Sequence, residues 1–248
     1  MNVRSLLAPN PGPFTLDGTN TWLLGETTVI DPGPAIASHI EAIRAAMPRL
    51  QLILITHRHD DHAPAAAVLK EATGARIFAP RNVLTDAVVD RRIAGGETLD
   101  VEGEQVEVIA TPGHTNEHVC FLTAGGGLFT GDTVLGTGTT AIFPPDGHMG
   151  DYLRSLDVLR AKQPKRIYPA HGPIREDAVA LIEEYIAHRL ERERQVLDCI
   201  AAGAASMREL RTRIYPDLDP RLHRAAEIQM TAHVIKLVEE GRVVSWKW

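Results

Sequence analysis

Histidine and aspartate gather in one short segment of the chain, which contains His57, His59, Asp61 and His62. In an extended segment, side chains two positions apart point the same way, so His57 and His59 can share one ion. Asp61 and His62, at the start of the following helix, can face a second ion. Imidazole and carboxylate ligands without a thiolate suit zinc, with manganese or iron as alternatives. The segment therefore predicts a metal site.

Three more potential ligands come later, each at the end of an expected strand. His114 follows the turn 111–113, Asp132 follows the strand 128–130, and His171 lies in a Pro-Ala-His-Gly turn. Side chains at strand ends are readily directed into a shared cleft. A loop in which histidines cluster by chance would not account for these three positions. We therefore expect all seven side chains to form one metal-binding cleft.

The expected elements place the histidine-rich segment at a corner between a strand and a helix. Apolar runs bounded by Gly, Pro or Asn predict strands at 21–25, 27–31, 52–55, 76–79, 105–110, 119–123, 128–130 and 166–168. Helical spacing of apolar residues predicts helices at 36–47, from 63 to about 73, at 152–161 and from about 176 to 202. This order indicates an α/β fold in which helices cover the outer faces of two sheets.

Gly203 ends the last long helix, and the chain beyond it differs in character. Residues 206–248 predict two helices around a turn with two prolines, then a β-ribbon at 242–248, an arrangement similar to a small winged helix. We therefore expect two domains, at 1–195 and 196–248. The second domain has eight Lys or Arg and seven Asp or Glu, a net charge of +1. Its weak field favours packing or homodimer formation over DNA reading.

The composition excludes several classes of protein. The 248 residues have a formal net charge of −6 and a pI near 6.0, which argues against a dedicated duplex-DNA binder. The longest apolar runs are too short to cross a membrane, and residues 1–16 lack the apolar core of a signal peptide. We therefore expect a cytoplasmic protein. Cys120 and Cys199 have no CxxC partner, so neither a disulfide scaffold nor a cysteine-rich zinc site is indicated.

The motif His57-x-His59-x-Asp61-His62, followed in order by His114, Asp132 and His171, resembles the metallo-β-lactamase superfamily. The resemblance covers residues 1 to about 195 and implies an αββα sandwich with two zinc ions. One ion would be held by His57, His59 and His114. The other would be held by Asp61, His62 and His171. Asp132 would bridge the two, and the resemblance assigns catalytic roles to Asp61 and Asp132.

Other motifs narrow the resemblance within the superfamily. The bridging Asp132 argues against an antibiotic-degrading enzyme, and His59 stands where flavodiiron members have glutamate. Nearly the whole chain is similar to the group of the endoribonuclease β-lactamase-like protein 2, through motifs at 10–13, 18–21, 112–115, 131–132, 138–140 and 188–189. Where relatives usually have Gly-Gly after the histidine motif, this chain has Ala63-Pro64-Ala65-Ala66. We expect the proline to narrow the cleft beside the second metal.

The activities of that group are divided: it resembles single-stranded RNA endonucleases and also fungal polyketide thioesterases. The expected reaction is therefore attack by a metal-bridging hydroxide on a phosphodiester of single-stranded RNA or on a small acyl thioester. Asp132 would position the metals and accept the proton of the hydroxide. The acidic charge and the 5% aromatic content fit the thioester at least as well as the RNA.

Four further residues are candidates for supporting roles. Asp31, at a strand end, is expected to bond the far nitrogen of a ligand histidine, with capping of its turn as the alternative. Thr139 and Thr140 lie in a glycine-bearing loop after Asp132, where their hydroxyls can contact substrate. His118 begins a strand and is a candidate either for substrate contact or for a purely structural hydrogen bond.

Two other functions are compatible with parts of this pattern. Some superfamily relatives bind a single iron and oxidise persulfides, but the full set of seven ligands argues for two metals. A nucleic-acid-binding regulator with a structural metal would use the C-terminal domain. Structural zinc sites are usually closed by four protein ligands, which argues against this alternative.

Overall fold

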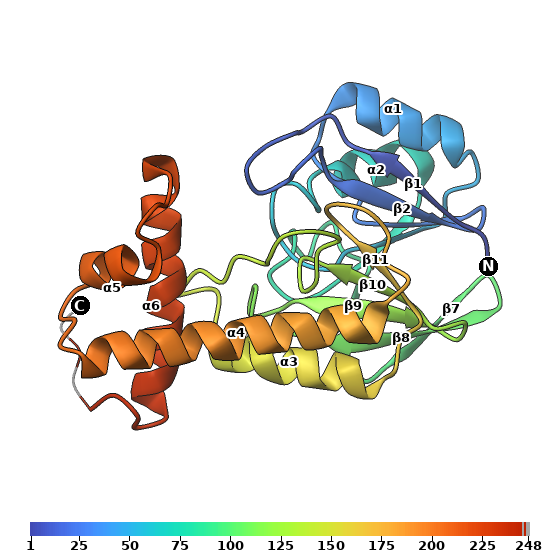
Figure 1. Ribbon diagram of the computed structural model, residues 1–248. Helices are drawn as coiled ribbons and strands as arrows, with labels where there is room; N and C mark the ends of the chain where they lie inside the picture. The colour runs from blue at the N-terminus through green and yellow to red at the C-terminus, as the bar shows by residue number, and fades with distance from the viewer. Residues whose placement is uncertain (245, 247–248) are drawn as a thin grey trace.

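The computed structural model describes residues 1–244 and 246, and it has two sheets packed face to face between layers of helices (Figure 1). The first sheet has the order β1-β2-β3-β4-β5-β6 and the second the order β11-β10-β9-β8-β7. This architecture is the predicted αββα sandwich. A helical C-terminal unit extends from one end of it (Figure 1).

The first sheet combines a hairpin edge with a parallel centre. Its strands are β1 (Val3–Leu7), β2 (Asn20–Leu24), β3 (Thr28–Ile30), β4 (Leu52–Leu54), β5 (Arg76–Ala79) and β6 (Arg91–Arg92). Strands β1 to β3 pair antiparallel, and β3 to β6 pair parallel. Helices α1 (Ala37–Ala46) and α2 (Ala65–Thr73) cover its outer face. Because both faces are covered, β2, β3 and β4 are buried throughout.

The second sheet is antiparallel except at its β10–β11 edge. Its strands are β7 (Thr98–Val101), β8 (Glu104–Ala110), β9 (Val119–Thr123), β10 (Gly127–Gly131) and β11 (Arg166–Pro169). Helices α3 (Met149–Ala161) and α4 (Ala178–Ala201) pack on its outer face. Helix α3 begins three residues earlier than predicted because the His148 side chain accepts a hydrogen bond from the Asp151 amide.

The core between the sheets is aromatic at the end near β11. Trp22 lies 5.0 Å from Tyr168 edge to face, and Phe129 stacks on Tyr168 at 4.7 Å, measured between ring centroids. The Trp22 indole also donates to the carbonyl of Pro169. These contacts fix β2, β10 and β11 relative to one another, so the chain that follows β11 has a defined starting point.

The directions of the strands bring chemistry-bearing residues to one edge. Strands β3 and β4 are parallel, as are β10 and β11, and β8 runs in the direction of β10 because both are antiparallel to β9. The loops after β4, β8, β10 and β11 carry the seven predicted ligands. Open sheets commonly bind ligands at the carboxyl ends of their strands.

The C-terminal unit contains α5 (Met207–Ile214), a 3₁₀ turn (Pro220–Leu222) and α6 (His223–Glu239). The predicted boundary at residue 195 falls inside α4, which therefore belongs to both parts of the molecule: Tyr185 packs with the second-sheet layer and Val196 with the C-terminal core. The predicted β-ribbon at 242–248 is wrong for residues 242–244, which form bends rather than a strand, and its remainder falls largely outside the described residues.

None of the helices in the described part of the chain combines the length and apolar character needed to span a membrane. This agrees with the short apolar runs of the sequence.

A buried ion pair joins α4 to α6. The carboxylate of Glu193 lies 2.6 Å from the Lys236 ammonium and also accepts from the Arg242 guanidinium. We expect Glu193→Ala to lower the free energy of unfolding by about 2–3 kcal/mol, because among the described residues Lys236 would keep only the half-exposed Glu240 as a partner. Urea unfolding measures this change. Glu191→Ala, at an exposed position of the same helix, should change stability by less than about 0.5 kcal/mol, and equal effects of the two changes would contradict the assignment.

Candidate metal centre

Seven side chains from four loops face one another at the strand ends. They form two groups that share Asp132, and within each group one ligand atom per residue lies within 4.8 Å of all the others. The first group comprises His57, His59, His114 and Asp132. The second comprises Asp61, His62, Asp132 and His171. Residues separated by more than a hundred positions in the sequence thus meet in one cleft.

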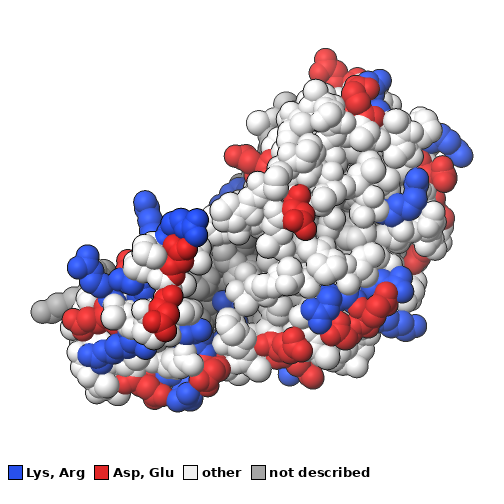
Figure 2. All heavy atoms as spheres, turned by 45° about the horizontal axis from the view of Figure 1, so that its top comes forward, with Lys and Arg blue, Asp and Glu red and all other residues white. Residues whose placement is uncertain are grey.

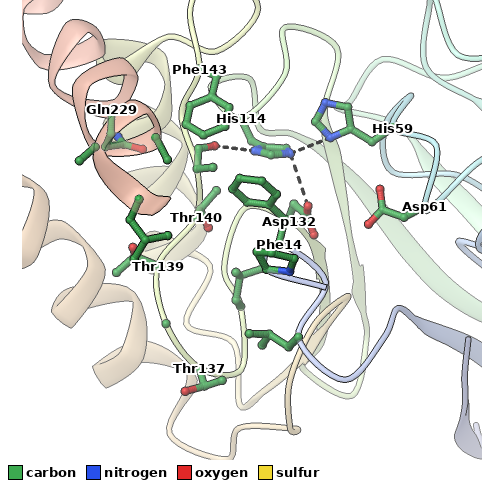
Figure 3. A pocket seen from close by; sticks show the side chains of 18 of the residues that line it. Phe14, His59, Asp61, His114, Asp132, Thr137, Thr139, Thr140, Phe143 and Gln229 are labelled. Atoms are coloured by element: carbon green, nitrogen blue, oxygen red, sulfur yellow. Dashed lines mark hydrogen bonds and ion pairs between the residues drawn. The ribbon is translucent and has the colours of Figure 1, made fainter. Parts of the chain in front are cut away.

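The first group directs three imidazoles at a common point. His57 Nε2 and His114 Nε2 each lie 3.0 Å from His59 Nδ1. His114 Nε2 also lies 3.4 Å from Asp132 Oδ2, and Figure 3 shows the contacts of His114 with both His59 and Asp132. A single proton cannot satisfy three ring nitrogens that converge in this way. A divalent cation can, because it accepts a lone pair from each.

The second group leaves buried polar atoms without hydrogen-bond partners. His62 Nε2, His171 Nε2 and Asp132 Oδ1 are all buried, and among the described residues they have close polar neighbours but form no well-oriented hydrogen bond. His171 Nε2 lies 3.2 Å from both Asp61 Oδ2 and Asp132 Oδ1. Orphaned polar atoms are costly inside a protein. Their mutual orientation and their mixed nitrogen and oxygen chemistry fit a second divalent metal ion.

The far sides of the ligand histidines are fixed by the protein. His62 Nδ1 bonds Asp31 Oδ2 at 2.9 Å, His114 Nδ1 donates to the Ala141 carbonyl, and His171 Nδ1 donates to the Gly18 carbonyl. Each of these bonds turns the Nε2 atom of its ring toward the cleft. Asp31 also accepts from the Thr56 amide and hydroxyl, both at 2.8 Å, so its carboxylate is held rigidly beside the motif.

The electrostatics differ between the two groups. Burial, reinforced by neighbouring histidines, lowers the pKa of His57 well below its usual value and that of His59 to about 4. Burial also opposes a charge on His62 and His171. The surrounding carboxylates outweigh this effect of burial, so the pKa of His62 rises well above its usual value and the pKa of His171 rises to about 9. Without a metal, protons on these two rings balance the carboxylates.

Two glycines give the loops their shape. Gly113 has a φ of +140°, and a Cβ there would lie 2.3 Å from the Tyr152 Cα on α3. Gly131 has a φ of +47°, and a Cβ there would lie 2.7 Å from the Thr56 hydroxyl. Only glycine permits these conformations and close approaches. The residues that follow them, His114 and Asp132, owe their positions to these turns.

His118 is buried behind the cleft. Its Nδ1 lies 2.9 Å from the Thr111 hydroxyl, and its Nε2 accepts from the Asp132 amide at 3.2 Å. The ring also stacks on His57 at 4.9 Å. Both ring nitrogens are therefore engaged by protein groups. In this position His118 holds the backbone of Asp132. The placement fits the structural hydrogen bond considered for His118 and not the substrate contact.

A cavity of about 620 Å³ opens from the ligands toward the C-terminal unit. Asp61, His114 and Asp132 lie at one side of it, and Thr139 and Gln229 at the other (Figure 3). The predicted substrate residues Thr139 and Thr140 both line it, but the Thr140 hydroxyl is already used in a 3.1 Å bond to the Thr133 carbonyl. Thr139 is exposed and has its side chain available.

Sequence reasoning missed most of the apolar cavity wall. It includes Phe14 and Phe143, whose rings meet edge to face at 5.9 Å, and several residues of the C-terminal unit. Phe14 follows a Pro-Gly-Pro turn and is 61% exposed, an unusual position for a large apolar side chain. In the sequence, the only indication of this apolar wall was a phenylalanine in a loop that begins with two prolines.

Comparison with known proteins agrees with this geometry. The sequence profile of the family described as "Metallo-beta-lactamase superfamily" matches residues 14–171, well over half of the chain. The chain belongs to the metallo-beta-lactamase superfamily. The profile "Beta-lactamase associated winged helix domain" matches residues 206–247 of this superfamily member. As a superfamily member with this donor set, the protein is a metal-dependent hydrolase.

Individual relatives cover nearly the whole of this metallo-beta-lactamase superfamily chain. A Beta-lactamase-like protein 2 homolog of Caenorhabditis elegans is 32% identical over 99% of this chain and 89% of its own length. An Atrochrysone carboxyl ACP thioesterase of Cryptosporiopsis sp. is 30% identical over 97% of this chain and 81% of its own. The crystal structure of a metallo-beta-lactamase family protein from Thermus thermophilus superposes with a TM-score of 0.78 at 23% identity, over 96% of this chain and 94% of that one, which shows a shared fold.

Asp31 provides a test of how the ligands are oriented. Asp31→Asn keeps the shape of the side chain but removes the charge that faces His62 Nδ1. We expect metal affinity to fall about 10- to 100-fold, as for other changes behind ligand histidines. Competition with a chromophoric chelator measures the affinity. Asp157→Asn, at an exposed position on α3, is the control, and an unchanged affinity in Asp31→Asn would show that this hydrogen bond does not support the site.

Metal binding should also depend on pH. Because the folded, metal-free pKa of His171 is about 9 and that of His62 is raised, both rings carry protons at neutral pH that a metal must displace. We therefore expect the apparent affinity to fall by roughly tenfold per pH unit for each displaced proton as the pH drops below 8. Zinc titrations between pH 6 and 8 measure the slope, and an affinity independent of pH would contradict this charge distribution.

Proposed function

We propose that the protein is a dinuclear zinc hydrolase that cleaves the thioester of an apolar acyl group. The two ligand groups that share Asp132 support two metal ions, and a relative named as a thioesterase supports the reaction. The observation that carries the substrate is the cavity beside the ligands, whose walls are mainly aliphatic and aromatic. Pockets of this volume and character accommodate small organic ligands.

Single-stranded RNA is the other candidate, because further relatives are named Beta-lactamase-like protein 2 homologs. Proteins that bind RNA strands combine aromatic stacking with basic side chains along the phosphates. Among the described residues that line the cavity there is no Lys or Arg, and Asp60, which belongs to neither ligand group, brings negative charge to it. Figure 2 shows a hollow between the two parts of the molecule, with mostly uncharged residues on the side of the larger part and residues of both charges on the side of the smaller part. This distribution favours the uncharged acyl group.

The residues of the cleft would have separate roles in the reaction. When bound, two zinc ions would lower the pKa of a water molecule between them and stabilise negative charge on the carbonyl oxygen. His57, His59 and His114 would hold one ion, and Asp61, His62 and His171 the other. Asp132 lies between both groups and is placed to accept the proton that the attacking water releases. Thr139 is placed to contact the polar part of the substrate.

The overall reaction consumes one water. Its oxygen forms a bond to the carbonyl carbon, and the bond between that carbon and sulfur breaks. Sulfur leaves with the bonding electron pair and takes up one of the two protons of the water to form a thiol, while the acyl group leaves as a carboxylate and the other proton passes to solvent. Phe14 and Phe143 would surround the apolar part of the acyl group and exclude bulk water from it.

The proposal is tested with metal-quantified protein, an octanoyl thioester of N-acetylcysteamine and a labelled single-stranded RNA. We expect thioester turnover, about two zinc ions per chain, loss of turnover with chelator and recovery with zinc. Asp132→Asn should lower kcat by roughly 10³-fold, because it removes a proton acceptor and a shared ligand, whereas the exposed control Asp157→Asn should not. RNA cleavage without thioester turnover would overturn the substrate assignment.

A further inference from the structure

We infer that the C-terminal unit forms the far wall of the substrate cavity and that Leu222, Ala225 and Ala226 determine the length of the acyl group accepted. This inference rests on the proposed thioester hydrolysis. It gives the C-terminal unit a role in substrate selection instead of nucleic-acid binding or dimer formation.

The cavity is built by both parts of the chain. The catalytic part contributes the metal ligands and the two phenylalanines. The C-terminal unit contributes a set of mostly apolar side chains: Tyr215, Leu218, Leu222, Ala225, Ala226 and Gln229. Residues 222, 226 and 229 recur at helical spacing, so they present one face to the cavity. A substrate whose carbonyl lies at Asp132 would therefore direct its acyl group toward α6.

Exposed apolar side chains mark this wall as a binding surface. Leu222 is 48% exposed and Phe14 is 61% exposed, yet both line the same cavity from opposite parts of the chain. Leaving such side chains in water forgoes the free energy of burial, and apolar patches rimmed by polar groups commonly mark ligand sites. An acyl chain between them would cover both.

The wall is fixed in place. Gln229 Oε1 accepts a hydrogen bond from the Ile142 amide at 2.9 Å, next to the Ala141 carbonyl that holds His114. Arg189 on α4 donates to the Thr140 carbonyl in the same loop. At the other end of α6, His148 Nε2 lies 2.8 Å from Glu239. Because α6 is bonded to the loop through Gln229 and to the start of α3 through Glu239, a larger side chain on its cavity face should fill the space instead of moving the wall.

Two small side chains leave the space open. Ala225 and Ala226 are the alanines of α6 that line the cavity, and neither is fully buried. Leucine ranks directly after alanine as a helix former, so Ala226→Leu should preserve the helix while removing cavity volume. In an apolar pocket, the presence or absence of one methylene can change kcat/KM by tenfold or more.

The experiment compares acetyl, hexanoyl and dodecanoyl thioesters of N-acetylcysteamine in the full-length, zinc-loaded protein. We expect Ala226→Leu to lower kcat/KM for the dodecanoyl substrate at least about tenfold and to leave the acetyl substrate within about twofold. Ala187→Leu, at an exposed position on α4, should leave this ratio unchanged. Thermal unfolding of both variants verifies that they are folded. Equal loss for all three substrates, or no loss, would overturn the inference.

A binding measurement separates this inference from the proposed reaction. Titration calorimetry with dodecanoate should give a Kd at least about tenfold weaker in Ala226→Leu than in the unchanged protein or in Ala187→Leu. If no thioester is hydrolysed but this difference in Kd is found, the proposed reaction fails and the acyl-binding wall stands. If thioesters are hydrolysed and Kd is the same in all three proteins, the wall is refuted and the reaction stands.

Discussion

The sharing of Asp132 by two groups of ligand atoms is the constraint on which the rest of the structure depends. One carboxylate has to face three imidazoles on one side and the Asp61 group on the other. Its position is set by Gly131 in a left-handed conformation and by the bond from its own amide to His118. His118 in turn packs on His57. A displacement of this single residue would therefore disturb both groups of the candidate metal centre at once.

The catalytic side of the molecule could be predicted from the sequence because its information is local. His57, His59, Asp61 and His62 are spaced for a strand-to-helix corner, and the later ligands stand directly after β8, β10 and β11. Periodicity also predicted eight of the eleven strands in the described part of the chain and most helices to within a few residues, but it missed β1, β6 and β7. The start of α3 was missed because a histidine cap, rather than an apolar repeat, begins that helix.

The cavity wall could not be predicted, because it depends on how distant parts of the chain pack together. Ala225 and Ala226 look like ordinary helix-forming residues in the sequence, and Leu222 looks like a residue of the core. Only the packing of α6 beside the loop 140–142 gives them a shared surface with Phe14. The supporting role of Asp31 was an open alternative for a similar reason: a turn cap and a partner of His62 require the same residue type at the same place.

Helix α4 runs without interruption from the layer on the second sheet, where Tyr185 packs, into the C-terminal core, where Val196 packs. Because α4 is not interrupted between these two clusters, it connects the second-sheet layer rigidly to the C-terminal core. Rotation of the C-terminal unit away from the second sheet would therefore require α4 to bend or Ala232 of α6 to leave the layer of α3 and α4 that it packs against.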